Sequence, residues 1–132
     1  MKKTKPESIL IVEDDNMLCT IFEMFIKELG YGETNTVETG EDAIEFCKKN
    51  KPDFVLMDIH LAGDLNGIQT AKIMGRDMNI PVIYISGDTN TETIKDAVLP
   101  NTYGFMTKPI HKDVLKLNIE FSFAKHNLVR SN

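Results

Sequence analysis

Residues 53–67 read DFVLMDIHLAGDLNG, an apolar run that ends on the carboxylate of Asp58 and then breaks into glycines. Runs that are apolar throughout are typical of parallel strands covered by helices on both faces. Other β-rich runs occur at 8–12, 34–37, 80–86 and 102–106, and helix-like segments separate them. This alternation predicts an α/β fold, a doubly wound five-stranded parallel sheet, with the polar run 34–37 at an edge.

Local signals mark where the helices of this fold begin and end. Asp15 or Asn16 is a good cap for the first helix, which Gly30 stops. Thr39 followed by Asp42 resembles a capping box for the second. The third begins at Gly67, and the fourth is short, with Ile94, Ala97 and Val98 as its apolar face.

The last helix-like segment, about 111–126, has more apolar residues than one helix stripe needs. One face holds Val114, Leu117, Phe121, Ala124 and Leu128, and further apolar residues stand at Leu115, Ile119 and Phe123. Packing into the core is the favoured interpretation of this surface, and an interface is the alternative.

Length and composition describe one ordinary domain. The chain has 132 residues, of which 42% are apolar and 27% are charged, as in a folded globular protein. We expect that domain at 8–127, with flexible ends at 1–7 and 128–132. Cys19 and Cys47 lie in apolar helical settings without CxxC spacing, which indicates buried thiols rather than a disulfide or a metal site.

Charge and hydropathy argue against two classes of partner. The net charge of -5 disfavours direct binding of nucleic acid, which relies on clustered Lys and Arg. No stretch approaches the roughly 18 to 20 apolar residues of a membrane span, and residues 1–8 lack the apolar region of a secretion signal. We therefore expect a cytoplasmic protein without a membrane partner.

Polar side chains stand at the expected carboxyl ends of four strands. They are Glu13, Asp14 and Asp15 after the first strand, Asp58 at the third, Ser86 at the fourth and Lys108 after the fifth. In a doubly wound sheet, ligands bind beyond these ends, where the strand order reverses. Clustered carboxylates raise each other's pKa unless a cation is present, and their oxygens suit Mg²⁺. A metal ion, a lysine and a hydroxyl together suit a phosphoryl group.

These residues resemble the receiver domain of two-component response regulators. The resemblance covers about residues 8–127 and rests on four motifs in order, VEDD (12–15), LMDIHLAGDLNGI (56–68), YISG (84–87) and GFMTKPI (104–110). It implies a flavodoxin-like (βα)5 fold with strand order 2-1-3-4-5. It also implies a signalling domain that is no enzyme beyond accepting and losing its own phosphoryl group.

The resemblance implies a role for each residue of the phosphoryl site. Asp58 would be the phosphoryl acceptor, and Lys108 and Ser86 would each bind a phosphoryl oxygen. Asp58 would also bind the metal, which is Mg²⁺ with Mn²⁺ as an alternative. The other ligands would be Asp14, the backbone carbonyl of His60 and, through a water molecule, Glu13.

The same resemblance implies a switch and a partner. Phe105 would turn inward when Ser86 moves toward the phosphoryl group, and His60 and Asp88 would tune the rate of phosphoryl loss. The phosphoryl donor would be a phosphohistidine on a sensor histidine kinase or phosphotransfer protein. The surface of the fourth helix, fifth strand and fifth helix would then signal to a downstream protein or fused output domain, and would serve a homodimer.

Two alternatives to this function remain open. One is a small Mg²⁺-dependent phosphohydrolase of the haloacid dehalogenase type, although neither Glu13-Asp14-Asp15 nor Asp58-Ile59-His60 forms the DxD pattern of those enzymes. The other is a receiver that acts only as an interaction module without phosphorylation. The intact set of Asp58, Ser86 and Lys108 argues against that reading.

Overall fold

The computed structural model describes residues 5–88 and 90–130, and along them five strands alternate with five helices. The strands are β1 (Ser8–Val12), β2 (Glu33–Val37), β3 (Phe54–Asp58), β4 (Val82–Ser86) and β5 (Thr102–Thr107). The helices are α1 (Asn16–Glu28), α2 (Gly40–Lys49), α3 (Gly67–Met78), α4 (Thr91–Ala97) and α5 (Lys112–Arg130). All strand pairs are parallel and the order is β2-β1-β3-β4-β5, so the predicted flavodoxin-like sheet is confirmed, with polar β2 at an edge.

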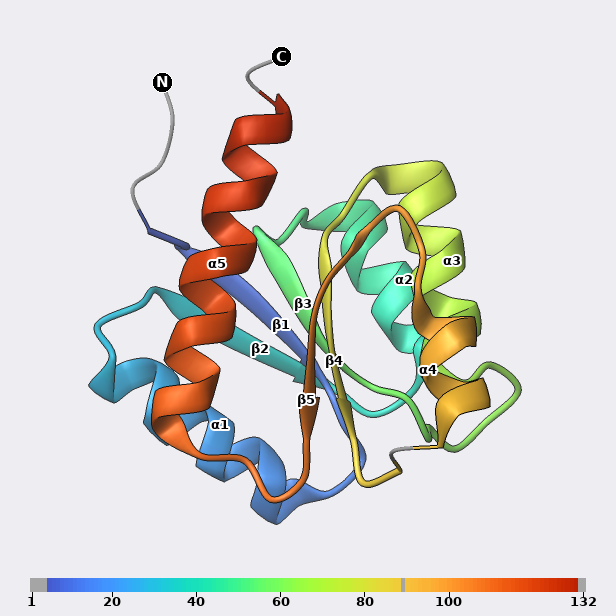
Figure 1. Ribbon diagram of the computed structural model, residues 1–132, viewed down its shortest axis with the longest axis horizontal. Coiled ribbons are helices and arrows are strands. Elements are labelled where there is room, and N and C mark those ends of the chain that lie inside the picture. The colour runs from blue at the N-terminus through green and yellow to red at the C-terminus, as the bar shows by residue number, and fades with distance from the viewer. Residues whose placement is uncertain (1–4, 89, 131–132) are drawn as a thin grey trace.

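The helices form two layers, one on each face of the sheet (Figure 1). α1 and α5 cover one face, and α2, α3 and α4 cover the other. Because all strands run in the same direction, their carboxyl ends and the loops that follow gather at one edge, the lower edge in Figure 1. The strand order reverses between β1 and β3, so the ligand-binding crevice of such a sheet lies beyond these two strands.

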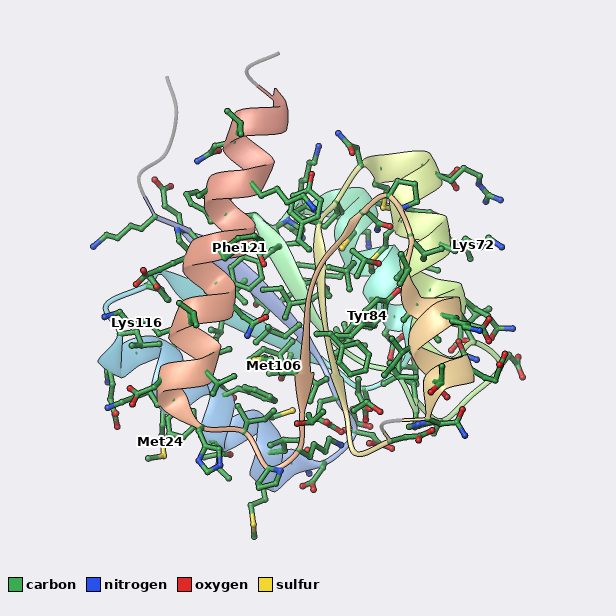
Figure 2. The ribbon with its side chains drawn as sticks, viewed as in Figure 1. Met24, Lys72, Tyr84, Met106, Lys116 and Phe121 are labelled. Atoms are coloured by element: carbon green, nitrogen blue, oxygen red, sulfur yellow. The ribbon has the colours of Figure 1, made fainter. Side chains whose placement is uncertain are left out.

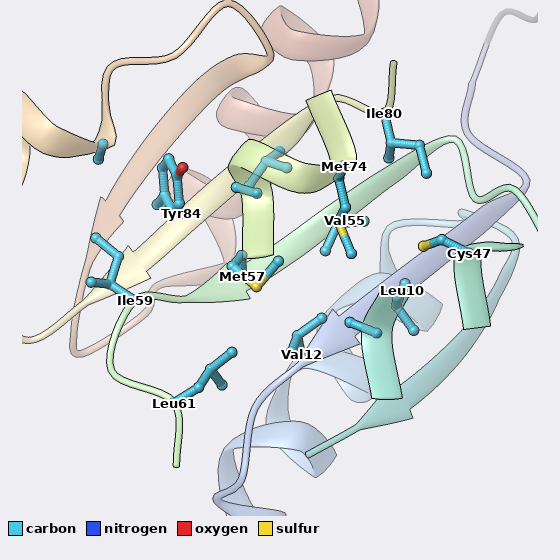
Figure 3. Packing of buried hydrophobic residues seen from close by; sticks show 14 residues of the cluster. Leu10, Val12, Cys47, Val55, Met57, Ile59, Leu61, Met74, Ile80 and Tyr84 are labelled. Carbon is cyan, nitrogen blue, oxygen red and sulfur yellow. The ribbon is translucent and has the colours of Figure 1, made fainter. Parts of the chain in front are cut away.

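Each layer buries its own apolar cluster against the sheet. The cluster under α2, α3 and α4 includes Leu10, Val12, Val55, Met57, Met74 and Tyr84 (Figure 3). The cluster under α1 and α5 includes Ile9, Ile11, Phe22, Leu56, Ile83, Leu115 and Ile119. Successive residues of β1 and β3 alternate between the clusters because successive side chains on a strand point to opposite faces. Each such burial contributes roughly 1.5–3 kcal/mol, and together they hold the strand ends in place.

The apolar residues of α5 are placed differently from the prediction. Leu115, Ile119 and Phe123 face the sheet and are buried. The predicted core face is exposed instead, at Val114, Leu117, Phe121 and Leu128. A helix presents only one face to a sheet, and the first three residues occupy it. The prediction that Val114, Leu117, Phe121 and Leu128 pack into the core is therefore wrong.

Several element ends also differ from the prediction. β4 begins at Val82 rather than at residue 80, because Pro81 has no N–H to donate to the sheet. α5 continues to residue 130, beyond the predicted end of that helix near residue 126. The backbone N–H of Glu7 donates to Asp53 Oδ2 at 2.7 Å, which ties the predicted N-terminal end to the sheet. The rest of both predicted ends, 1–4 and 131–132, lies outside the described residues.

Three smaller predictions concern single side chains. Val98 is exposed rather than packed, because α4 ends at Ala97. Cys19 and Cys47 are free, buried thiols, and burial raises the pKa of each to about 11, as it does for an inert structural cysteine.

Among residues 5–88 and 90–130, no helix combines the length and apolar character needed to cross a membrane.

Candidate functional site

The three acidic residues that follow β1 have different surroundings. Glu13 follows the strand directly, and only 1% of it is exposed. Its Oε2 accepts a hydrogen bond from the backbone N–H of Asp15 at 3.1 Å. The Asp15 carboxylate accepts from the N–H groups of Met17 and Leu18, so Asp15 is the helix cap that the sequence predicts. Asp14 lies between them and is exposed.

β3 delivers Asp58 to the same edge of the sheet. Asp58 is buried, and its Oδ1 accepts a hydrogen bond from the backbone N–H of His60 at 3.1 Å. α3 begins directly behind it, because Gly67 N–H donates to the carbonyl of Ile59 at 2.8 Å. A Cβ at Gly67 would overlap the carbonyl oxygen of Asp58. Glycine at this position is therefore what allows α3 to start so close to the acidic strand end.

The Ser86 hydroxyl is engaged by its own loop. Its Oγ accepts a hydrogen bond from the backbone N–H of Asp88 at 2.9 Å and donates to the carbonyl of Asp88 at 3.1 Å. The Asp88 carboxylate accepts from the N–H of Asn90 at 2.8 Å and from the hydroxyl of Thr93 at 3.1 Å. This chain of contacts joins Ser86 to the first turn of α4.

Lys108, the residue directly after β5, brings a positive charge to the acidic residues. Its backbone N–H donates to the carbonyl of Ser86 at 2.9 Å, which aligns the residue with the end of β4. Its Nζ lies 3.4 Å from Glu13 Oε1 and 3.6 Å from Asp58 Oδ2. One ammonium therefore contacts carboxylates that follow β1 and end β3, and these three residues come together as predicted.

Burial and mutual charge shift the pKa values of this group. Burial, followed by the nearby Asp58 carboxylate, raises the pKa of Glu13 from 4.5 to about 7. Burial lowers the pKa of Lys108, but the Asp58 and Glu13 carboxylates outweigh that effect and the pKa is raised. Lys108 therefore stays charged at neutral pH, while Glu13 titrates there.

The carboxylates at this edge fit a divalent cation. Glu13, Asp14 and Asp58 each present a ligand oxygen, and these oxygens lie within 4.8 Å of one another. The buried Oε1 of Glu13 has no hydrogen-bond partner among the described residues, although the Lys108 ammonium is nearby. Hard oxygen donors with spare acceptor capacity are suited to Mg²⁺. The donor set therefore fits a divalent metal ion, and its identity as Mg²⁺ stays a prediction.

The predicted tuning and switch residues lie around this group. The His60 Nε2 is 3.8 Å from Asp88 Oδ2, and both side chains are more than a third exposed, so the two tuning positions meet at the mouth of the site. Phe105 is partly buried on β5, and its ring centroid is 6.3 Å from that of Tyr84. Their roles, like the metal-binding role of the His60 carbonyl, stay predictions.

The comparison with protein families identifies this edge of the sheet. The family model described as response regulator receiver domain matches residues 9–120. The chain belongs to this family. As a receiver domain of a two-component response regulator, it is a signalling module, and its acidic group stands where such domains carry their phosphoryl acceptor.

Known proteins similar to this receiver domain are longer regulators. It is 30% identical over 117 residues to the transcriptional regulatory protein ZraR of Escherichia coli K12, covering 88% of this chain and 26% of that protein. It is 28% identical over 106 residues to the cell cycle transcriptional regulator CtrA of Caulobacter vibrioides, covering 80% and 45%. The chain thus spans between about a quarter and a half of the length of these relatives.

Two solved structures share its fold closely. The signal receiver domain of a modulated diguanylate cyclase from Desulfovibrio desulfuricans superposes with a TM-score of 0.86 at 32% identity, covering 95% of this chain and 98% of that one. NtrX from Brucella abortus gives a TM-score of 0.84 at 28% identity, covering 96% and 28%.

Two contacts of this receiver domain were not found from the sequence. Thr93 binds the Asp88 carboxylate from α4, and Glu41 Oε1 on α2 accepts the N–H of Leu65 in the loop after β3 at 2.9 Å. A 24-residue separation hides the second contact from any local pattern. For the contact between Thr93 and Asp88, the only signal in the sequence was a threonine in the expected first turn of a short helix.

Proposed function

We propose that this receiver domain accepts a phosphoryl group on Asp58 from a phosphohistidine of a sensor histidine kinase or phosphotransfer protein. The observation that carries the proposal is the placement of the Asp58 carboxylate, buried at the end of β3 and 3.6 Å from the Lys108 ammonium. A carboxylate beside a fixed positive charge is suited to receive a group whose oxygens are negative.

The residues of the crevice divide the chemistry between them. An Asp58 oxygen attacks phosphorus, a new O–P bond forms, and the N–P bond to the donor histidine breaks. Lys108 offsets charge on the equatorial oxygens during transfer. Asp14 and Asp58 would hold Mg²⁺, or Mn²⁺, with the His60 carbonyl as a third ligand, and Glu13 would act through water. The bound ion supplies positive charge that neutralises the phosphoryl oxygens.

Ser86 couples phosphoryl transfer to the surface formed by α4, β5 and α5. To bond a phosphoryl oxygen, its hydroxyl exchanges the two contacts that it makes with the backbone of Asp88. Phe105 then turns inward, and the surface of α4, β5 and α5 shifts toward a second arrangement. We infer that this surface is read by a downstream protein or a fused output domain, and that His60 and Asp88 set how long the phosphoryl group stays.

We further propose the bounds, location and partners of the domain. The functional unit is the domain at 8–127, it works in the cytoplasm without contacting nucleic acid or membrane directly, and its α4-β5-α5 surface serves a homodimer. Its chemistry is limited to acceptance and loss of its own phosphoryl group.

Phosphotransfer with matched acidic variants tests the acceptor. Radiolabelled phosphoryl groups are offered to the chain by a panel of histidine kinases, with Mg²⁺ present. We expect at least one donor to label the wild type and Asp64→Asn, an exposed acid in the loop after β3, but not Asp58→Asn. Label retained by Asp58→Asn would remove this residue from its role.

The same set of proteins separates the alternatives. A haloacid dehalogenase-type phosphohydrolase would turn over a small phosphate ester, and that activity would survive the loss of Asp58. A domain that is only an interaction module would form no adduct with beryllofluoride or acetyl phosphate in Mg²⁺. We expect no turnover and a beryllofluoride adduct that depends on Asp58.

A further inference from the structure

Helix α5 is apolar on two opposite sides. Its inner side, with Leu115, Ile119 and Phe123, packs on the sheet. Its outer side carries the outer stripe, defined as Val114, Leu117, Phe121, Ala124 and Leu128. The four large side chains of this stripe are 45%, 69%, 66% and 63% exposed in that order. A helix with apolar residues on both sides is expected to be covered on both sides.

The spacing of the outer stripe indicates what covers it. Its residues follow one another by three, four, three and four positions, which places them at alternating a and d positions of a heptad. That spacing produces a straight seam along a helix and is typical of pairing with a second helix. The stripe runs over fifteen residues, 114–128, and its ends are about 21 Å apart at 1.5 Å per residue. It therefore suits a helix rather than a loop or a small molecule.

The charges that flank the stripe identify the second helix. In this heptad register, Glu120 occupies a g position and Lys125 the following e position. In a parallel pair of identical helices, each g residue faces the e residue five positions later on the other helix. Glu120 of each copy would then face Lys125 of the other copy, twice in a symmetric dimer. In an antiparallel pair g faces g, where the residues are Asp113, Glu120 and Asn127, and no basic partner is available.

The neighbours of α5 leave these groups accessible. Glu120 makes an ion pair along its own helix, with Lys116 at 3.8 Å, and both side chains are 55% exposed. Lys125 Nζ rests over the ring of Tyr103, 5.2 Å from its centroid, on the flank toward β5. α4 lies across the sheet from α5, as Figure 1 shows, and Figure 2 places Phe121 on the side of the sheet away from Tyr84. No described element buries the four large side chains of the stripe.

We propose that the outer stripe of α5 pairs in parallel with the same stripe of a second copy of this chain, with Glu120 of each copy against Lys125 of the other. This interface differs from one formed by α4, β5 and α5 together, because its apolar contacts come from α5 alone. It does not depend on phosphorylation of Asp58. It would bring the carboxyl ends of two α5 helices side by side.

Sedimentation of the full chain tests the surface. Two heptads form a short seam, so the titration extends to several hundred micromolar, roughly the range of weak complexes. We expect dimers of the wild type, and a dissociation constant at least about tenfold higher for Leu117→Glu with Phe121→Glu, since central apolar anchors dominate an interface. Val98→Glu, at an equally exposed apolar residue on the α4 side, is the matched control and should leave dimers intact.

The outcomes separate this interface from its rivals. A wild type that stays monomeric without beryllofluoride would overturn the proposal, whether or not it dimerises once beryllofluoride and Mg²⁺ are added. So would dimers that Val98→Glu disrupts and the double stripe variant does not. Circular dichroism of each variant confirms that it is folded, because these positions are exposed and carry no core contact.

Charge exchange tests the parallel orientation. Glu120→Lys should weaken dimerisation because it places two lysines against each other, and Lys125→Glu should do the same with two acids. The variant that carries both changes should recover the wild-type affinity. Ala124→Cys should form an intermolecular disulfide under mild oxidation, since residues at one d position meet in a parallel pair. Failure of both the recovery and the cross-link would exclude the parallel arrangement.

Discussion

Glu13 shows how the position of one residue sets its chemistry. It is buried beside Asp58, and its Oε1 has no hydrogen-bond partner among the described residues. Burial and the Asp58 charge raise its pKa to about 7. In the absence of a cation, the ionised form of Glu13 therefore opposes folding near neutral pH, although Lys108 offsets part of that cost.

The pH dependence of stability should report this acid. Between pH 4.5 and 7 the unfolded chain releases the Glu13 proton while the folded chain keeps it, so this contribution to stability is lost as pH rises. We expect the unfolding free energy of the wild type, relative to Glu13→Gln, to fall by on the order of 3 kcal/mol across that range in EDTA. Urea titrations at each pH measure it, with Glu23→Gln as an exposed control; parallel curves would refute the assignment.

Tyr84 is a second residue whose environment is set by the fold. It is fully buried under the layer of α2, α3 and α4, and its hydroxyl has no hydrogen-bond partner among the described residues (Figure 3). Burial raises its pKa to about 12, and nearby Thr102 acts in the other direction. The Thr102 hydroxyl is engaged elsewhere, since it donates to the carbonyl of Ala97 and accepts from the N–H of Leu99.

Removing the Tyr84 hydroxyl should therefore not destabilise the domain. A buried hydroxyl without a partner costs about 1–3 kcal/mol, so Tyr84→Phe should leave the unfolding free energy unchanged or raise it by up to that amount. Thermal or urea denaturation measures the change. Thr102→Val, which removes two hydrogen bonds, is the contrasting variant and should destabilise. A loss of more than about 1 kcal/mol in Tyr84→Phe would show that the hydroxyl is bonded in solution.

At the scale of elements, the start of α3 is packed against the end of β3. The Asn66 side chain caps α3 and Gln69 completes a capping box, so the helix has a defined first turn. Gly67 then lies directly against the carbonyl of Asp58. The glycine-rich loop is thus part of the geometry that holds the acceptor carboxylate.

Two glycines make a matched test of this contact. Gly67→Ala should destabilise the domain by roughly 1–3 kcal/mol, because backbone atoms of Asp58 and Ile59 cannot move aside cheaply. It should also slow phosphoryl acceptance. At Gly87 an added Cβ meets nothing within 4 Å, so Gly87→Ala should change stability by less than about 0.5 kcal/mol. Chemical denaturation measures both, and equal stabilities would exclude the steric explanation.

At the scale of the whole molecule, folding and metal binding are linked. The ligand oxygens come from residues after β1 and at the end of β3, so they are brought together only when the central sheet forms. A ligand that binds the folded state alone stabilises it in proportion to the logarithm of its concentration. Mg²⁺ should therefore stabilise the entire domain and not one loop.

Denaturation with and without Mg²⁺ measures this linkage. At a concentration one hundred times the dissociation constant, the wild type should gain about 2.7 kcal/mol of unfolding free energy. Asp14→Asn should abolish most of that gain while folding normally, because Asp14 is exposed. Asp64→Asn is the control and should keep it. A gain that is equal in all three proteins would place the ion elsewhere.

Much of the fold was predictable because its signals are local. Alternating apolar runs and caps such as Asp15 and Thr39 depend on backbone geometry within a few residues, and the structure places both caps as expected. Once the strands are parallel, polar residues at their carboxyl ends must gather at one edge. Asp58 and Lys108 could therefore be placed together from the sequence, and their separation confirms it.

The tertiary structure alone decided between local patterns that are equivalent in the sequence. Both sides of α5 satisfy helical periodicity, so the sequence by itself determined that it is a helix but not which side is buried. In the folded domain Leu115 and Ile119 pack with Ile83 and Met106 of the sheet, and the Ser122 hydroxyl donates to the carbonyl of Tyr103 at 2.7 Å. Because a helix presents only one face to a sheet, these contacts leave the outer stripe exposed.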